Sequence, residues 1–460
     1  MQELTKQLEQ APIIYVTRDI ERALGLVDTP NYYIISNYNE SFKNVDNNIL
    51  FIKEDRQLDT WELLQHPETK KFISDTFNYP KKRDSCATAK ALGDTRSTPP
   101  TSSSGSVGMT ARIIVFKPTK QIEKICQENN WGLLNPSAKL SNKVEEKISQ
   151  LDWLDDLKKY LPDNTVEKCK NIKPFGPFKH FEHFQPFILQ FNRSHTGSGT
   201  ILIESDKQLE EIKNKFPDRE ARLVKYIDGP IFTNNNIVAK NKTLLGNINY
   251  QITGLQPFTD LPFATIGNDW GFPHKYLTGE QIAQYKKIVT DIGDKLRRDG
   301  WKGLFGVDVV VEESTGKLYL IEINARQPAS TTYESQLQSN IRITPPEADP
   351  SWSKNDYEHT NKLTTTFEAH LASLLDIDLS DYNLIEIKNG AQIISRLTTH
   401  ITHNNPTIIE KLKKEKLILT EYNNTKPGSD LLRIQSQDSI IKAHNEFNEL
   451  GKKILDKITI

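Results

Sequence analysis

Two carboxylates and an amide lie at matching positions of two apolar segments within residues 303–330. The segments VDVVV and KLYLIEIN flank a short turn, and they carry Asp308, Glu322 and Asn324. Side chains alternate along a β-strand, so Glu322 and Asn324 must share one face of the second segment. These residues are the first candidates for chemistry in the chain.

The two segments are predicted to pair as a β-hairpin. A hairpin that closes symmetrically about Thr315 pairs Val311 with Tyr319. The same register places Asp308 directly opposite Glu322, where two like charges repel. In such apolar surroundings, burying both carboxylates unpaired would cost stability or raise a pKa.

A divalent cation would remove this repulsion. The oxygens of Asp308, Glu322 and Asn324 form a hard ligand set that suits Mg²⁺ carrying substrate phosphates. Arg326 would point to the same side if the strand continued, and it could stabilise developing negative charge. The alternative is a solvated edge strand, but residues 309–311 and 318–323 are too apolar for an edge.

A glycine-rich loop, residues 195–200 (HTGSGT), joins two strand-like runs earlier in the chain. A Walker A loop or a dinucleotide fingerprint opens a helix, and this loop leads into a strand, so both are excluded. A strand–loop–strand flap can instead cover a nucleotide triphosphate with its backbone N–H groups. A plain hairpin turn would use the same glycines, so the loop alone leaves both interpretations open.

The elements that position these residues follow from hydrophobic periodicity. Four apolar runs that alternate with helical patterns favour a parallel α/β sheet: residues 12–16, 31–36, 47–52 and 111–116. Apolar residues three or four apart predict one amphipathic helix over 141–160. The Ser/Thr-rich insert 81–110 has few large apolar residues and is predicted to be a flexible linker.

The composition limits the classes of protein to consider. The 460 residues include 59 Lys and Arg against 60 Asp and Glu, a net charge of −1, which argues against nucleic acid or an acidic membrane as partner. Three widely spaced cysteines predict neither a disulfide framework nor a zinc site. Because no apolar run suits a signal peptide or a membrane span, we expect a cytoplasmic protein.

The order of these motifs resembles the ATP-grasp superfamily over about residues 136–375. The resemblance rests on Asn142-Lys143 in a helix, the glycine-rich flap, the run LVKYIDGP, and Glu-x-Asn-x-Arg after a GVD strand. It implies two α+β subdomains that hold ATP between them. It also implies that residues 1–135 form the α/β domain that precedes this module in the peptide-ligase-like branch, and that residues 376–460 form a small C-terminal α+β extension.

The resemblance assigns roles to individual residues. It implies that Asp308, Glu322 and Asn324 hold Mg²⁺, with Mn²⁺ as a substitute. Arg326 matches the catalytic arginine that biotin carboxylase-like members place after the Asn. The residues that would contact ATP come from the first subdomain, the flap and the adenine hinge, and they are Lys143, Gln190, His195, Gly197, Ser198, Gly199, Thr200, Lys225, Tyr226 and Ile227.

One position departs from the family pattern. Many members have a second lysine on the strand that enters the flap, where this chain has Gln190. A glutamine can donate a hydrogen bond to a phosphate but supplies no charge, so part of the phosphate affinity must come from elsewhere. Arg193 or His195 could supply it.

The resemblance implies an ATP- and Mg²⁺-dependent ligase. Such an enzyme activates a small-molecule or peptide carboxylate as an acyl phosphate, which an amine or a similar nucleophile then attacks. Two alternatives stay open: a kinase-like phosphotransferase, and a non-catalytic ATP-binding sensor or scaffold, which Gln190 keeps under consideration. The sequence indicates neither the substrates nor the oligomeric state.

Two other polar segments could in principle form sites. Residues Asn268, Asp269 and Trp270 lie in a long aromatic segment and are candidates to line the acceptor side, although a packed structural loop is an equal alternative. A metal set within residues 180–183 is disfavoured, because its spacing fits no known ligand pattern.

Overall fold

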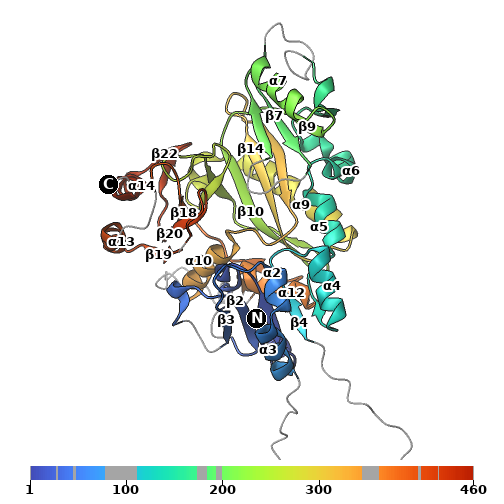
Figure 1. The fold of residues 1–460 in the computed structure, drawn as a ribbon, viewed down its shortest axis with the longest axis vertical. Helices are drawn as coiled ribbons and strands as arrows, with labels where there is room; N and C mark the ends of the chain where they lie inside the picture. The colour runs from blue at the N-terminus through green and yellow to red at the C-terminus, as the bar shows by residue number, and fades with distance from the viewer. Residues whose placement is uncertain are drawn as a thin grey trace, which may run out of the picture.

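The computed structural model describes most of the chain: residues 2–26, 29–44, 48–77, 111–173, 184–192, 199–343, 362–401, 406–422 and 424–458. The predicted linker 81–110 lies outside these residues. Three sheets of four or more strands organise the described part (Figure 1). In Figure 1 the N-terminal sheet lies at the bottom, a small sheet at the top, and a large sheet between them.

The N-terminal sheet is parallel, with the strand order β3-β2-β1-β4-β5. Its strands are β1 (Ile13–Val16), β2 (Tyr32–Asn37), β3 (Ile49–Ile52), β4 (Arg112–Ile114) and β5 (Gly132–Leu133). Every residue of β1 is buried, as expected for a central strand of a covered parallel sheet. The helices of this region are α1 (Gln2–Gln10), α2 (Thr60–Gln65), α3 (Pro67–Phe77) and α4 (Lys120–Glu128). The predicted parallel α/β region is confirmed.

The helix predicted over residues 141–160 is interrupted. It consists of α5 (Ala138–Glu145), α6 (Ser149–Leu154) and the 3-10 helix η3 (Asp155–Tyr160). The backbone of Glu146 is extended, and Asn192 bonds the N–H groups released by the break, accepting from Lys147 N (3.4 Å) and Ile148 N (2.9 Å). Because α5 ends at Glu145, Lys147 does not follow the helical spacing of Lys143.

The small sheet is antiparallel, with the order β6-β9-β7-β8. Its strands are β6 (Asn164–Lys168), β7 (Phe187–Phe191), β8 (Thr200–Ile203) and β9 (Glu220–Lys225), and α7 (Asp206–Lys215) follows β8. Leu189 and Leu223 pack with Leu209 of α7 in one core. Because side chains alternate, Gln190 and Arg222 belong to the opposite face.

The large sheet has nine strands in the order β15-β14-β10-β12-β13-β18-β20-β19, with β11 beside β10. The strands are β10 (Ile231–Val238), β11 (Thr243–Leu244), β12 (Asn249–Thr253), β13 (Thr265–Asp269), β14 (Gly303–Val311), β15 (Leu318–Asn324), β18 (Ala391–Arg396), β19 (Ile418–Glu421) and β20 (Asp430–Ser436). Helix α9 (Gly279–Arg298) packs its buried side on the apolar residues of this sheet. Antiparallel sheets with helices complete the predicted α/β and α+β class.

The C-terminal region continues the large sheet. Strands β18, β20 and β19 extend it beyond β13, as Figure 1 shows on the left. The remaining elements there are α13 (Pro406–Lys413), β21 (Ile441–Ala443), β22 (Glu446–Phe447) and α14 (Glu449–Ile458). The domain boundary at residue 376 stays a prediction, but this region shares one sheet with the module before it.

Helices α10 (Thr331–Ile343) and α12 (Thr366–Leu374) connect the large sheet to the N-terminal sheet. The ring of Phe367 lies against Tyr15 and Tyr32, with centroid distances of 6.1 and 6.2 Å. The short elements α8 (Pro273–Tyr276), β16 (Leu363–Thr364) and β17 (Asn383–Leu384) complete the frame. No helix in the described ranges combines the length and apolarity that a bilayer span requires.

Hydrogen bonds of Asp269 connect the end of β13 to the C-terminal region. Its buried carboxylate accepts hydrogen bonds from the backbone N–H groups of residues 271–272 (2.9 Å each), Ile440 (2.7 Å) and Ile441 (3.1 Å). Burial raises the pKa of this carboxyl group. Trp270 is fully buried as well. Asp269 and Trp270, two of the three acceptor candidates in this loop, are therefore buried within the fold.

Asp269→Ala is expected to destabilise the protein by at least about 3 kcal/mol, because it leaves several buried N–H groups without an acceptor. Chemical denaturation followed by circular dichroism measures this. The matched control is Asp438→Ala, which removes an exposed carboxylate of the same region and should change stability by less than about 0.5 kcal/mol. Equal losses in both variants would contradict this structural role of Asp269.

Candidate active site

Strands β14 and β15 place the two carboxylates side by side. Asp308 and Glu322 are directly paired, as predicted, but the predicted pairing of Val311 with Tyr319 is wrong. Val311 pairs with Leu318, and a register shift after Asp308 absorbs one residue of β15. A β-bulge of this kind bends the ladder locally, and such bulges are frequent next to active sites.

Asp308 is buried and accepts hydrogen bonds from two neighbouring side chains. Thr233 Oγ1 of β10 donates to Asp308 Oδ1 (2.6 Å), and Asn324 Nδ2 donates to Asp308 Oδ2 (3.3 Å). Asp308 is only 5% exposed. Burial, reinforced by the neighbouring charge of Glu322, raises the pKa of Asp308. Gly306 lies opposite Asn324, and a Cβ at this glycine would come within 3.3 Å of Asn324 Cβ.

The oxygens of Asp308, Glu322 and Asn324 suit a bound divalent cation, which would relieve the repulsion between the two carboxylates. Asp308 and Glu322 are neighbouring carboxylates whose charges repel, and Asn324 adds an amide oxygen on the same side. Among the described residues, no group of three or more His, Cys, Asp and Glu gathers as a metal site. A cation held here would thus complete its shell with water and substrate oxygens, which is the usual mode of Mg²⁺.

Lys147 is the lysine that contacts this site. Its Nζ lies 2.9 Å from Glu322 Oε1, and its side chain is 13% exposed. Although burial opposes the effect, Lys147 and Arg326 lower the pKa of Glu322. Lys143, which the resemblance implied, is exposed on α5. The break after Glu145 explains the difference, because it turns the next lysine toward the hairpin.

Arg326 is oriented by a carboxylate rather than by the strand. The condition that β15 continue to residue 326 is not met: the strand ends at Asn324, and Arg326 N bonds Asn324 O (2.9 Å). Arg326 Nη1 lies 2.5 Å from Glu145 Oε1, and Lys117 Nζ lies 2.5 Å from Glu145 Oε2. The carboxylates of Glu145 and Glu322 raise the pKa of Arg326 against the effect of burial. The guanidinium therefore stays charged beside the hairpin.

The flap is described only at its ends. Gln190 pairs with Thr200, and Gln190 Nε2 lies 3.5 Å from Thr200 Oγ1. Gly199 O accepts from Phe191 N (3.1 Å). His195, Gly197 and Ser198 lie outside the described residues, so their contacts with ATP stay a prediction, as does the role of Arg193.

The predicted adenine hinge connects the two sheets. Residues 226–230 link β9 of the small sheet to β10 of the large sheet. Lys225 Nζ lies 3.5 Å from Glu312 Oε1 just after β14, so an ion pair spans the junction. Tyr226 OH donates to Asp228 Oδ1 (3.4 Å), while Ile227 is buried. The Lys225–Glu312 contact connects the hinge to the hairpin at the junction of the two sheets, and the contact of the hinge with adenine stays a prediction.

A polar row extends from the hairpin across the large sheet. We use this name for Thr233, Asn249, Asn268 and Gln392. Asn249 pairs with Thr233 on β10, Asn268 Nδ2 donates to Asn249 Oδ1 (2.8 Å), and Gln392 Nε2 donates to Asn268 Oδ1 (3.0 Å). The strand register places the row on the face that carries Asp308. Of the three acceptor candidates, Asn268 alone belongs to it.

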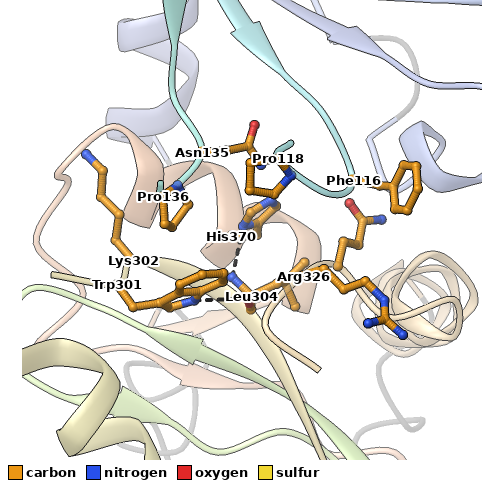
Figure 2. A pocket seen from close by; sticks show the side chains of 10 residues that line it. Phe116, Pro118, Asn135, Pro136, Trp301, Lys302, Leu304, Arg326 and His370 are labelled. Carbon is orange, nitrogen blue, oxygen red and sulfur yellow. Dashed lines mark hydrogen bonds between the residues drawn. The ribbon is translucent and has the colours of Figure 1, made fainter. Parts of the chain in front are cut away.

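A small cavity lies behind Arg326, between the N-terminal region and α12 (Figure 2). Its volume is about 220 Å³ including its open mouth, and His370 and Trp301 line it. His370 Nδ1 accepts from Leu304 N (3.2 Å), and burial lowers the pKa of His370 to about 3, so this ring is neutral. A space of this size is below that of typical ligand pockets and is not the nucleotide site.

Comparison with known proteins agrees with this geometry. Residues 144–330 match the model of the ATP-grasp domain family. No curated protein matches this chain in sequence. The family match contains the hairpin, the hinge and the flap strands.

Solved structures resemble the whole chain at low sequence identity. N5-carboxyaminoimidazole synthase from Aspergillus clavatus, in complex with ADP and 5-aminoimidazole ribonucleotide, is 11% identical with a TM-score of 0.58, covering 97% of this chain and 98% of that one. N5-carboxyaminoimidazole synthetase from Staphylococcus aureus, complexed with ADP, is 12% identical with a TM-score of 0.57 and 97% coverage of both chains. L-amino acid ligase from Bacillus licheniformis is 11% identical with a TM-score of 0.55, covering 97% and 96%.

At these identities the neighbours establish the fold. Together with the family match, they show an ATP-grasp module preceded by a parallel α/β region. Residues 144–330 therefore match the ATP-grasp domain family, as their motifs predicted.

Metal affinity at the hairpin should rise with pH. The raised pKa of Asp308 means that a proton competes with the cation until this carboxyl group ionises. We expect Mn²⁺ binding in the presence of ADP, followed by electron paramagnetic resonance, to strengthen steadily from about pH 5 to about pH 8.

Glu322→Gln keeps the shape of the site but removes one charge. It should weaken Mn²⁺ binding about tenfold or more and move the pH dependence to lower pH, because Asp308 loses its repelling neighbour. Glu313→Gln, on the same hairpin but outside the set, is the control and should leave the curve unchanged. An unchanged curve for Glu322→Gln would contradict the assignment.

Proposed function

We propose that this protein is an ATP- and Mg²⁺-dependent ligase that joins a carboxylate to an amine or a similar nucleophile. The observation that carries the proposal is the buried pairing of Asp308 with Glu322, with Asn324 beside them and two cations, Lys147 and Arg326, close by. This arrangement supports the binding of a triphosphate with its divalent cation. The neighbours crystallised with ADP support the same nucleotide.

A carboxylate resists attack because its leaving group would be oxide. In the proposed reaction a carboxylate oxygen attacks the γ-phosphorus of ATP, the bond to the β,γ-bridging oxygen breaks, and ADP leaves. The amine then attacks the carbonyl carbon of the acyl phosphate, and phosphate departs with the former carboxylate oxygen. The products are an amide, ADP, phosphate and one proton.

In the proposed reaction, the protein mainly positions the reactants and supplies charged groups that stabilise the transition state. Asp308, Glu322 and Asn324 would hold Mg²⁺, which neutralises phosphate charge when bound. Lys147 exchanges its contact with Glu322 for a phosphate oxygen, and Arg326 stabilises the charge that develops on the transferred group. Glu145 keeps the Arg326 guanidinium in place, because its carboxylate bridges Arg326 and Lys117.

The acceptor side is proposed along the polar row. Its amides start at Thr233, the partner of Asp308, and continue over β12 and β13 to Gln392. The Oε1 atom of Gln392 is buried and has no hydrogen-bond partner among the described residues. The neighbours' titles name a ribonucleotide and an L-amino acid ligase, which supports a small molecule or a short peptide as substrate.

Incubation with ATP, Mg²⁺ and panels of carboxylic acids and amines tests the proposal. We expect ADP and phosphate in equal amounts, formed only when an acid and a nucleophile are present together, with a new amide detected by mass spectrometry. Phosphate retained on the acid after the reaction would favour a kinase-like phosphotransferase. ATP binding without turnover across the panel would favour a sensor or scaffold.

Arg326→Met should lower kcat by about 10² while leaving the affinity for ADP nearly unchanged, because its charge is needed mainly in the transition state. Steady-state kinetics and calorimetry with ADP measure the two quantities. Arg342→Met, which removes an ion pair with Glu368 away from the site, is the control. A loss of ADP affinity as large as the loss of kcat would assign Arg326 to ground-state binding instead.

A further inference from the structure

The small sheet lacks a lysine at position 190 but holds another cation beside it. Strands β7 and β9 pair Gln190 directly with Arg222. Both side chains lie on the face opposite α7, since the alternating residues Leu189 and Leu223 fill the core beneath that helix. Arg222 therefore occupies the strand position paired with residue 190, where many family members have a lysine.

Arg222 is buried with few partners. It is 1% exposed, and its Nε has no hydrogen-bond partner among the described residues. Its Nη1 donates to Gln150 Oε1 at 3.4 Å, a long contact. Gln150 in turn donates to Val144 O (2.7 Å), so this amide is already anchored on its own segment. Within the described part of the chain, at least one of the five N–H donors of this guanidinium is thus left without an acceptor.

The charge of Arg222 interacts electrostatically with Glu322 of the hairpin. Burial lowers the pKa of Arg222 to about 10, and the carboxylate of Glu322 acts in the opposite direction. Glu322 belongs to the large sheet and also contacts Lys147. The guanidinium thus lies on the side of the small sheet that faces the proposed phosphate site.

A buried cation without a full set of acceptors destabilises a fold, and an apolar side chain of similar size is often at least as stable. An anion that enters between the sheets would satisfy the free donors. We infer that Arg222 is the phosphate-binding cation of the small sheet, in place of the lysine that is absent at position 190. The inference rests on the proposed nucleotide site, and it identifies the source of charge that Gln190 cannot supply.

A structural role for Arg222 gives a different expectation. If the guanidinium mainly braces Gln150, its removal should lower stability and affect all ligands alike. If it binds phosphate, its removal should spare the fold and affect only ligands that carry the β- and γ-phosphates.

The test compares Arg222→Met with wild type by calorimetry, using ATP and adenosine with Mg²⁺, and by thermal unfolding without ligand. We expect ATP affinity to fall about tenfold or more, since charge-assisted hydrogen bonds are lost. Adenosine affinity and the Tm of the free protein should not fall. Arg222→Lys retains the charge and should keep most of the ATP affinity.

Gln190→Lys adds a second, independent readout. In the Arg222→Met background it should restore ATP affinity, and in wild type it should gain less, because Arg222 already neutralises the phosphates. Unchanged ATP affinity in Arg222→Met, an equal loss for adenosine, or a variant that fails to fold would each overturn the inference. Wild-type protein that binds neither ATP nor ADP would instead overturn the proposed function on which it rests.

Discussion

The repulsion between Asp308 and Glu322 is the constraint on which the site depends. The register of β14 and β15 forces the two carboxylates together. Asp308 is buried, which weakens the screening of its charge by water, while the Glu322 side chain is 36% exposed. The surroundings offset this only in part: Thr233 donates to one carboxylate, and Lys147 pairs with the other. The residues that interact with the two carboxylates come from separate elements. Thr233 lies on β10, Lys147 follows the break after α5, and Arg326 lies in the turn after β15. In the proposed site, a divalent cation would neutralise the repulsion that these partners leave.

The N-terminal region takes part in this arrangement. Lys117 shares Glu145 with Arg326, so a cation of the first domain helps orient the arginine of the hairpin. The next residue, Gln327, accepts from Tyr15 OH (2.5 Å) and bonds Phe116 O through its N–H group (3.0 Å). The turn that carries Arg326 is therefore held from the N-terminal sheet. The N-terminal region therefore helps to fix the position of the turn that carries Arg326.

The sequence predicted the local patterns well and the interactions between distant segments poorly. Alternation and apolar content were sufficient for the hairpin and for the pairing of Asp308 with Glu322, although the bulge changed the register near the turn. Lys147 was missed because only the break after Glu145, which Asn192 stabilises from another strand, directs it to the site. The role of Asp269 depends on N–H groups about 170 residues further along the chain, which periodicity does not reveal.

The most direct test of the central claim is a crystal structure with Mn²⁺ and a non-hydrolysable ATP analogue, analysed by anomalous scattering. The account predicts a Mn²⁺ peak in contact with oxygens of Asp308, Glu322 and Asn324, at about 2.0–2.2 Å, with the phosphates between the two sheets. A nucleotide bound elsewhere, or a cation that leaves these three side chains in their present hydrogen bonds, would contradict it.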